Sequence, residues 1–160
     1  MSIEKLDHYS IRTTDVRRSV AFYEQALGFV AGARPPFGFP GAWLYRATAD
    51  GQTVGTSVVH VVGIDAADAA GLVDYLGDKP LAPGAGTGAL DHIAFAATDL
   101  AGTYARLHAN RIAFRERKVP DMALHQLFID DPDGVTIELN YAQADDIASG
   151  QINLARRAAT

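Results

Sequence analysis

A short sequence pattern occurs twice in the chain, in the same order and context both times. Leu-Asp-His stands at residues 6–8 and again at 90–92, and a Thr-Asp pair follows at the same distance, at 14–15 and at 98–99. Each copy then continues into a helical pattern and later reaches an Asp-Gly turn. A repeat constrains the fold more than any other feature, since overlooking one changes the assignment of the whole chain. The duplication predicts two copies of one small module.

The first copy predicts a strand, a helix and three further strands. Apolar residues recur every three or four positions over 16–27, as they do in an amphipathic helix. We expect Thr14 to cap the start of this helix and Gly28 to end it. Period-two alternation and β-branched residues predict the strands around the helix, at 5–12, 29–34, 42–47 and 54–62.

The second copy predicts the same order of elements. A helix is expected over 99–110, with Thr98 as its cap. The strands are expected at 90–97, near 112–118, at 124–130 and at 135–141. The predicted fold class is therefore α+β, with two tandem βαβββ modules.

Turn-rich segments divide the chain into four parts. We expect the first βαβββ module at 1–64, a linker with a short helix and a Gly/Pro-rich loop at 65–89, the second module at 90–141 and a C-terminal tail at 142–160. The sequence leaves the tail undecided between a loose helix, a docking arm and disorder. A module of this size makes a poor core alone, so we expect fusion of the two or a homodimer.

Composition excludes several classes of site and partner. The 160 residues contain no cysteine, which excludes disulfides, Cys-ligated zinc, iron–sulfur clusters and thiol nucleophiles. The net charge is −5, with 14 Lys and Arg spread thinly, so no nucleic-acid partner is expected. No apolar run approaches the roughly 18 residues that span a bilayer, and the first residues lack a signal peptide's apolar stretch. We therefore expect a cytoplasmic globular protein with no membrane partner.

Histidines fall at matching strand positions in the two copies. His8 and His92 each end the repeated tripeptide, where a strand is expected. His60 lies among β-branched residues in strand 54–62. Glu138 lies in mid-strand on a polar face, where a carboxylate needs partners or water. A single strand histidine is more often structural than functional, but the duplicated pair favours a function.

These four side chains suit a metal site if the two modules curve their sheets toward one another. Neutral imidazoles and one carboxylate are ligands for Fe, Mn, Ni, Co or Zn, with positions left for water or substrate. We therefore predict one divalent metal ion held by His8, His60, His92 and Glu138.

The chain resembles the vicinal oxygen chelate superfamily, which contains glyoxalase I, bleomycin-resistance proteins, methylmalonyl-CoA epimerase and extradiol dioxygenases. The matching segments are LDHYSIRTTDVRRSVAFYEQALGF at 6–29, LDHIAFAATDL at 90–100 and FIDDPDGVTIELNY at 128–141. The resemblance implies two βαβββ modules whose curved mixed sheets form a cup around a metal site. It makes His8 and His92 the first-strand ligands and Glu138 the last-strand ligand of the second module.

The last-strand ligand of the first module is less regular. The candidate, His60, lies nine residues past Gly51, whereas Glu138 lies four past Gly134. An insertion or a longer turn at 52–56 would reconcile the two spacings.

The resemblance implies a small substrate that chelates the metal through adjacent oxygens, and it leaves three functions open. A four-ligand site predicts a glyoxalase-type lyase or isomerase, in which Glu138 also moves a proton. His8, His92 and Glu138 alone match the triad of an Fe(II) extradiol ring-cleavage dioxygenase, although Phe128 stands where a tyrosine is expected. The third function is metal-free ligand sequestration of the bleomycin-resistance type, against which the retained ligand set argues.

Five further residues are candidates for catalysis or substrate binding. His125 is a candidate acid–base residue, or a packed one, because it alternates with apolar neighbours. Arg12 shares a face with His8 and suits either an anionic substrate group or a surface salt bridge. Phe37, Phe39 and Trp43 lie in a stiff segment rich in proline and glycine. This segment suits either a substrate pocket or a loop or subunit contact.

Overall fold

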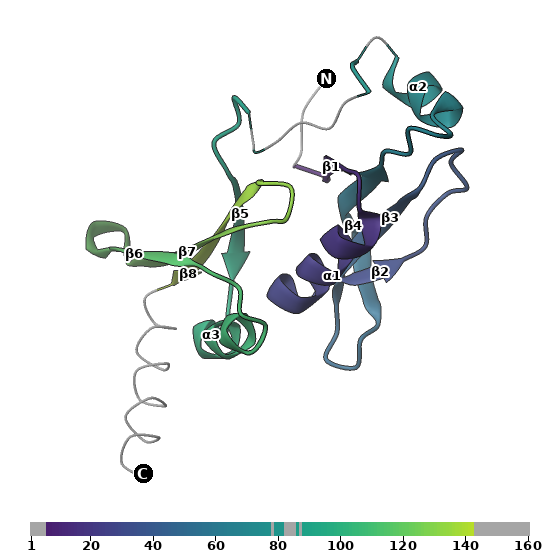
Figure 1. Cartoon of the computed structure of the whole chain (residues 1–160). Helices are drawn as coiled ribbons and strands as arrows, with labels where there is room; N and C mark the ends of the chain where they lie inside the picture. The colour runs from purple at the N-terminus through teal and green to yellow at the C-terminus, as the bar shows by residue number, and fades with distance from the viewer. Residues whose placement is uncertain (1–5, 78, 82–85, 87, 143–160) are drawn as a thin grey trace, which may run out of the picture. The chain divides into compact units, whose positions relative to one another are not determined.

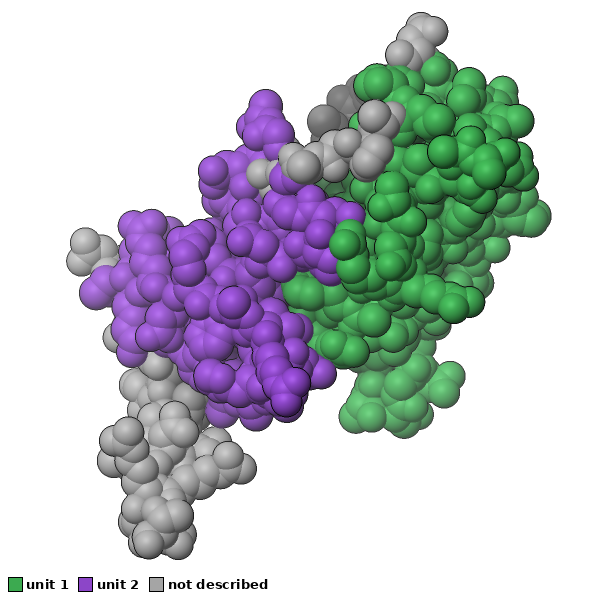
Figure 2. All heavy atoms as spheres, viewed as in Figure 1, with its two compact units in different colours: residues 1–84 green, residues 85–160 purple. Residues whose placement is uncertain are grey.

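The computed structural model describes residues 6–77, 79–81, 86 and 88–142. The chain divides into two compact units, residues 1–84 and 85–160 (Figures 1 and 2). Each unit is described by itself. Of the tail expected at 142–160, all but Ala142 lies outside the described residues.

The first unit contains a four-stranded mixed sheet and two helices (Figure 1). Its elements are β1 (Tyr9–Thr13), α1 (Val16–Leu27), β2 (Val30–Gly32), β3 (Gly41–Ala47), β4 (Thr53–Gly63) and α2 (Ala70–Leu76). The strands lie in the order β1-β4-β3-β2, with β1 parallel to β4 and the other pairs antiparallel.

The second unit repeats this topology. Its elements are β5 (Ile93–Ala97), α3 (Leu100–Ala109), β6 (Arg115–Val119), a 3₁₀ turn (Pro120–Met122), β7 (Leu124–Asp130) and β8 (Thr136–Ala142). The strands lie in the order β5-β8-β7-β6, with β5 parallel to β8. The α+β class with two tandem βαβββ modules is therefore confirmed.

The helix expected over 16–27 forms over those residues and ends at Gly28 as predicted, but the predicted N-terminal caps are wrong in the same way in both copies. Asp15, not Thr14, caps α1, because its carboxylate accepts a hydrogen bond from the Arg18 amide at 3.0 Å. In α3, Asp99 takes the place expected of Thr98. A carboxylate that reaches the third helical amide satisfies a donor that the helix itself leaves unpaired.

A helix covers one face of each sheet. In the first unit α1 buries Tyr23 and Ala26 and packs on β3 and β4, whose Leu44 and Val59 are fully buried. In the second unit the hydroxyl of Tyr141 on β8 donates to the Thr103 hydroxyl on α3 at 2.9 Å. Side chains alternate along a strand, so the residues between these buried ones lie on the other face of each sheet.

A small second core holds α2 on that other face of the first sheet. Phe39, Val62 and Leu72 are buried together, and partly buried Leu76 packs against them. Because this cluster joins the 33–40 loop to α2, it fixes the loop that precedes β3. In the part of the chain that the structure describes, no helix has the length and apolar character that a membrane crossing requires.

Candidate functional site

His60 and Glu138 occupy equivalent positions in the two sheets. Ser10 pairs with His60 across the parallel strands β1 and β4, and Ala94 pairs with Glu138 across β5 and β8. Each of these first-strand partners lies two residues after the histidine of the repeated tripeptide. The fold therefore presents the same pair of positions twice, filled by two histidines in one unit and by a histidine and a glutamate in the other.

A strand irregularity accounts for part of the unequal spacing that the sequence shows. Between the pair Leu44–Val59 and the pair Arg46–Val54, β3 advances two residues while β4 advances five. The extra residues on β4 include Gly55, whose φ of 69° favours glycine. The structure places the extra residues of β4 between Val54 and Val59, which overlaps the segment 52–56 that the sequence suggested.

Three aromatic rings stack in the first unit. The rings of His8 and His60 are stacked with centroids 3.8 Å apart, and Trp43 stacks on His60 at 4.2 Å. Nε2 of His60 lies 2.8 Å from the Ser57 hydroxyl, and Nδ1 of His8 lies 2.8 Å from the Asp7 carboxylate. His60 is thus held on both faces and at one ring nitrogen.

In the second unit a histidine and a carboxylate lie side by side. Nε2 of His92 is 3.2 Å from Oε2 of Glu138, and Nδ1 of His92 is 2.7 Å from the Asp91 carboxylate. Glu138 is buried, and its other oxygen, Oε1, accepts from the side-chain amides of Gln126 at 2.9 Å and Asn140 at 2.6 Å. These two amides satisfy one oxygen of a buried carboxylate, which leaves Oε2 directed to His92.

The chemistry of the donors fits a divalent ion for three of the four predicted ligands. A carboxylate at Nδ1 of His8 and of His92 leaves Nε2 as the metal-binding nitrogen, as is usual for ligating histidines. His60 fits less well, because each imidazole keeps its ion in the ring plane and two nearly parallel stacked rings do not share such a point. Among the described residues no group of three or more His, Cys, Asp or Glu is close enough to hold a metal.

His60 and His92 have pKa values shifted in opposite directions. Burial, with a further contribution from His8, lowers the pKa of His60 to about 4. The hydrogen bond to Asp91 is the main cause that raises the pKa of His92. At neutral pH His60 is therefore an uncharged ring.

We expect the metal-free protein to lose stability on acidification through His60. Its pKa is lower in the folded chain than the usual value near 6.5, so the unfolded chain takes up its proton first as the pH falls. The stabilisation is complete above about pH 6.5 and is lost as the pH falls toward 4. His60→Gln should remove this part of the acid sensitivity in urea unfolding at pH 7 and pH 4.5. Imidazole NMR that shows His60 titrating near pH 6.5 would contradict the expectation.

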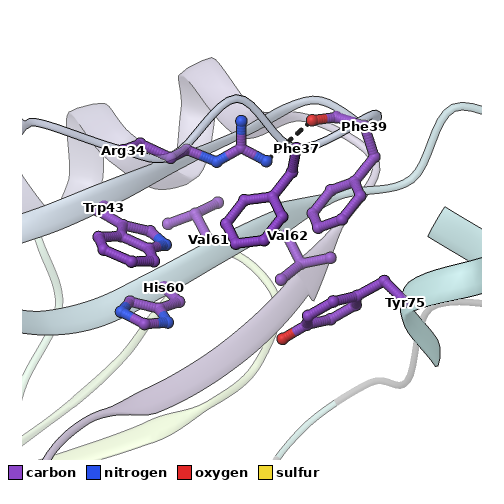
Figure 3. Close-up of a pocket in the computed structure, with 8 residues that line it drawn as sticks. All are labelled: Arg34, Phe37, Phe39, Trp43, His60, Val61, Val62 and Tyr75. Carbon is purple, nitrogen blue, oxygen red and sulfur yellow. Dashed lines mark hydrogen bonds between the residues drawn. The ribbon is translucent and has the colours of Figure 1, made fainter. Parts of the chain in front are cut away.

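The three aromatic residues predicted to bind substrate lie together in one pocket (Figure 3). The pocket is a hollow open to solvent, and its empty space of about 250 Å³ includes part of that solvent. Besides two valines of β4, its lining consists of Arg34, Phe37, Phe39, Trp43, His60 and Tyr75. Sequence reasoning included Arg34 only as the first residue of the aromatic segment 34–43, without a role for its charge, and it missed Tyr75 as a lining residue. Tyr75 reaches the pocket from α2, a contact for which the sequence carries no signal.

Arg12 and His125 are not among the described residues that line the pocket. Nη1 of Arg12 donates to the carbonyl of Pro80 at 2.5 Å, so this guanidinium holds the linker. His125 is buried on β7 and pairs with Tyr141, on the face that α3 covers, whereas Glu138 lies on the opposite face. Its Nε2 lies 3.2 Å from the Tyr104 hydroxyl of α3. The structure therefore favours packing over catalysis for His125.

Comparisons with known proteins agree with this topology. A family model described as the Glyoxalase/Bleomycin resistance protein/Dioxygenase superfamily matches residues 5–139. No curated protein sequence matches the chain. A solved virulence protein from Salmonella typhimurium is 19% identical, with 89% of this chain and 99% of that one covered and a TM-score of 0.59.

Two further solved structures are similar. The fosfomycin resistance protein FosX from Listeria monocytogenes is 14% identical, with 88% of this chain and 95% of that one covered and a TM-score of 0.58. An antibiotic binding protein from a Streptomyces species is 21% identical, with 89% of this chain and 98% of that one covered and a TM-score of 0.57. At these identities the likenesses show the fold.

Proposed function

Because the chain belongs to the Glyoxalase/Bleomycin resistance protein/Dioxygenase superfamily, we propose that it is a divalent-metal-dependent enzyme of the glyoxalase type. It would act as a lyase or isomerase on a small substrate that binds the ion through adjacent oxygens. The observation that carries the proposal is the repeated Asp-His pair, in which the carboxylates of Asp7 and Asp91 orient the rings of His8 and His92.

The residues that we propose to hold the ion are His8, His92 and Glu138. A divalent ion at such a site would polarise the substrate oxygens that bind it. We remove His60 from the ligand set proposed from sequence, because its ring is stacked between His8 and Trp43 and its Nε2 is bonded to Ser57.

Glu138 has one oxygen for two proposed roles. Oε1 is held by Gln126 and Asn140, so both metal binding and proton transfer would use Oε2. Gln126 and Asn140 thereby act as positioning residues for this carboxylate. Neutral amides satisfy Oε1 without adding a charge that would compete with the ion for the carboxylate.

A second candidate function is an Fe(II) ring-cleavage dioxygenase. The specific observation in its favour is the exclusion of His60, since His8, His92 and Glu138 then form a set of two histidines and one carboxylate. Assays with substrates of the two enzyme types distinguish the glyoxalase-type function from the dioxygenase.

Metal analysis and two assays test the proposal together. Protein purified without chelators should contain about one divalent ion per site, measured by mass spectrometry, and should bind added Fe, Mn, Co, Ni or Zn. Isomerisation of glutathione hemithioacetals would support the glyoxalase type, and oxygen consumption with a panel of catechols would replace it by the dioxygenase. Absence of any metal affinity would overturn both and leave a ligand-sequestering protein. Light scattering of the same sample tests the proposed homodimer.

We expect Asp91→Ala to weaken metal binding about 10- to 100-fold without abolishing it. The carboxylate lies 2.7 Å from Nδ1 of His92 and fixes the tautomer that leaves Nε2 as the donor. Calorimetric titration of the metal-free variant measures the change, and Asp68→Ala, at an exposed aspartate, is the matched control. Equal affinities of the Asp91→Ala variant and the wild type would show that Asp91 does not orient a ligand.

A further inference from the structure

We propose that the pocket between the 33–40 loop, β3, β4 and α2 binds a planar aromatic anion, such as an aryl carboxylate. Its ring would lie against the aromatic walls and its negative charge against Arg34. The inference rests on the proposed function only in treating this ligand as the substrate, since the binding itself needs no metal.

Five of the eight described residues that line the pocket carry aromatic rings (Figure 3). Trp43 and His60 lie ring over ring on one side, with an interplanar angle of 4°. Phe37 and Phe39 stack at 5.3 Å, and Tyr75 lies 5.0 Å from Phe39. Flat rings set around an open space favour a flat ligand, because aromatic pairs gain attraction beyond the area that they bury.

The exposure of two of these rings indicates an aromatic surface that a ligand could cover. Phe37 is 39% exposed and Tyr75 49% exposed, although both pack against buried Phe39. The pocket is open to solvent, so a ligand with a single ring, or one end of a larger molecule, would lie against its walls with one side exposed.

Arg34 supplies a positive charge that has no carboxylate partner among the described residues. Its Nη2 donates to the Phe39 carbonyl at 2.9 Å, and its guanidinium lies 5.0 Å and 5.1 Å from the ring centroids of Phe37 and Phe39. None of the described contacts of Arg34 is to a carboxylate, and the described lining contains no acidic residue. Burial lowers the pKa of Arg34 with no opposing carboxylate, as expected for a charge that has lost water without gaining a counter-ion.

Besides Arg34, the described lining contains no Lys, Arg, Asp or Glu. His60 contributes a ring that stacks on Trp43, and Tyr75 contributes a hydroxyl. The pocket therefore combines one cation with aromatic faces. An anion attached directly to an aromatic ring matches both features, whereas an aliphatic anion or a neutral aromatic molecule matches only one.

Trp43, the only tryptophan in the chain, lines the pocket and provides the test. Metal-free protein in EDTA is titrated with benzoate, benzyl alcohol and cyclohexanecarboxylate, and Trp43 fluorescence is followed. We expect benzoate to bind at least about tenfold more tightly than either of the other two, an amount that one charged or stacking contact accounts for. Saturable quenching by benzoate that exceeds both controls supports the proposal.

Variants separate the charge from the fold. Arg34→Met should weaken benzoate binding at least about tenfold and leave benzyl alcohol binding unchanged, while Arg34→Lys should retain part of the benzoate affinity. Arg17→Met, at an exposed arginine of α1, is the matched control and should bind as the wild type does. If Arg34→Met does not fold, the three-ligand comparison in the wild type still decides.

Three results would overturn the inference: no saturable benzoate binding, benzoate affinity unchanged in Arg34→Met, or cyclohexanecarboxylate binding as tightly as benzoate. Each is distinguishable from failure of the proposed function. A protein that binds metal but not benzoate keeps the enzyme proposal and loses this one. A protein that binds benzoate but no metal keeps this inference and loses the enzyme proposal.

Discussion

Replacing His92 with alanine should lower the affinity for divalent ions by at least about 100-fold. Loss of a residue that only orients a ligand costs about 10- to 100-fold, and loss of the ligand itself costs more. His92 is the one histidine among the described residues whose Nε2 lies beside the buried carboxylate of Glu138, at 3.2 Å. Without His92, the carboxylate of Glu138 would lose the neighbouring ligand with which we propose that it binds the ion.

Calorimetric titration of the metal-free variant with Mn²⁺ or Zn²⁺ measures the loss. His108→Ala is the matched control, because His108 lies exposed on α3, and its affinity should equal that of the wild type. His60→Ala provides the sharper comparison and should change the affinity by no more than about threefold, since our three-ligand set does not include it. Losses of equal size in His60→Ala and His92→Ala would restore His60 as a ligand.

Gly71→Ala should destabilise the protein by about 1–3 kcal/mol and abolish binding in the aromatic pocket. A Cβ at Gly71 would lie 2.1 Å from the carbonyl oxygen of Gly38, so the backbone of the 33–40 loop has to move. That loop carries Phe37 and Phe39, and hence two walls of the pocket. Overpacking against backbone is costly because no rotamer change relieves it.

The same substitution at Gly38, on the other side of this contact, is the control. A Cβ at Gly38 would meet the Cα of Gly71 at 3.4 Å, an ordinary separation, and we expect Gly38→Ala to leave stability nearly unchanged. Urea unfolding of the two variants, with benzoate titration of Trp43 fluorescence, measures both effects. Equal stabilities for Gly71→Ala and Gly38→Ala would mean that α2 does not hold the loop in place.

Local sequence patterns predicted most of the fold. The apolar spacing over 16–27 predicted α1, and the repeated tripeptide with its Thr-Asp pair predicted that two strands would begin two matching modules. The N-cap assignments failed because the sequence offers a threonine and an aspartate side by side, and both residue types cap helices. Only the backbone geometry at Asp15 and Asp99 decides between them.

The candidate site was predictable where it depends on strand register and unpredictable where it depends on distant contacts. Alternation placed Glu138 on the face opposite Tyr141, as the structure has it. The repeated aspartates, Asp7 and Asp91, stood in the same tripeptide as the histidines and were overlooked, although that repetition was a usable signal. The sequence gives no comparable signal for Tyr75, because its place in the pocket follows from the packing of α2 on Val62.

The location of the pocket has a consequence for how such a protein changes over evolutionary time. Every described residue that lines the pocket belongs to the first unit, whereas Glu138 and the two amides that hold it belong to the second. If the pocket binds the ligand as proposed, substitutions that alter ligand preference would fall in one half of the gene without touching this carboxylate or its support. Selection for a new ligand would then act on the first half.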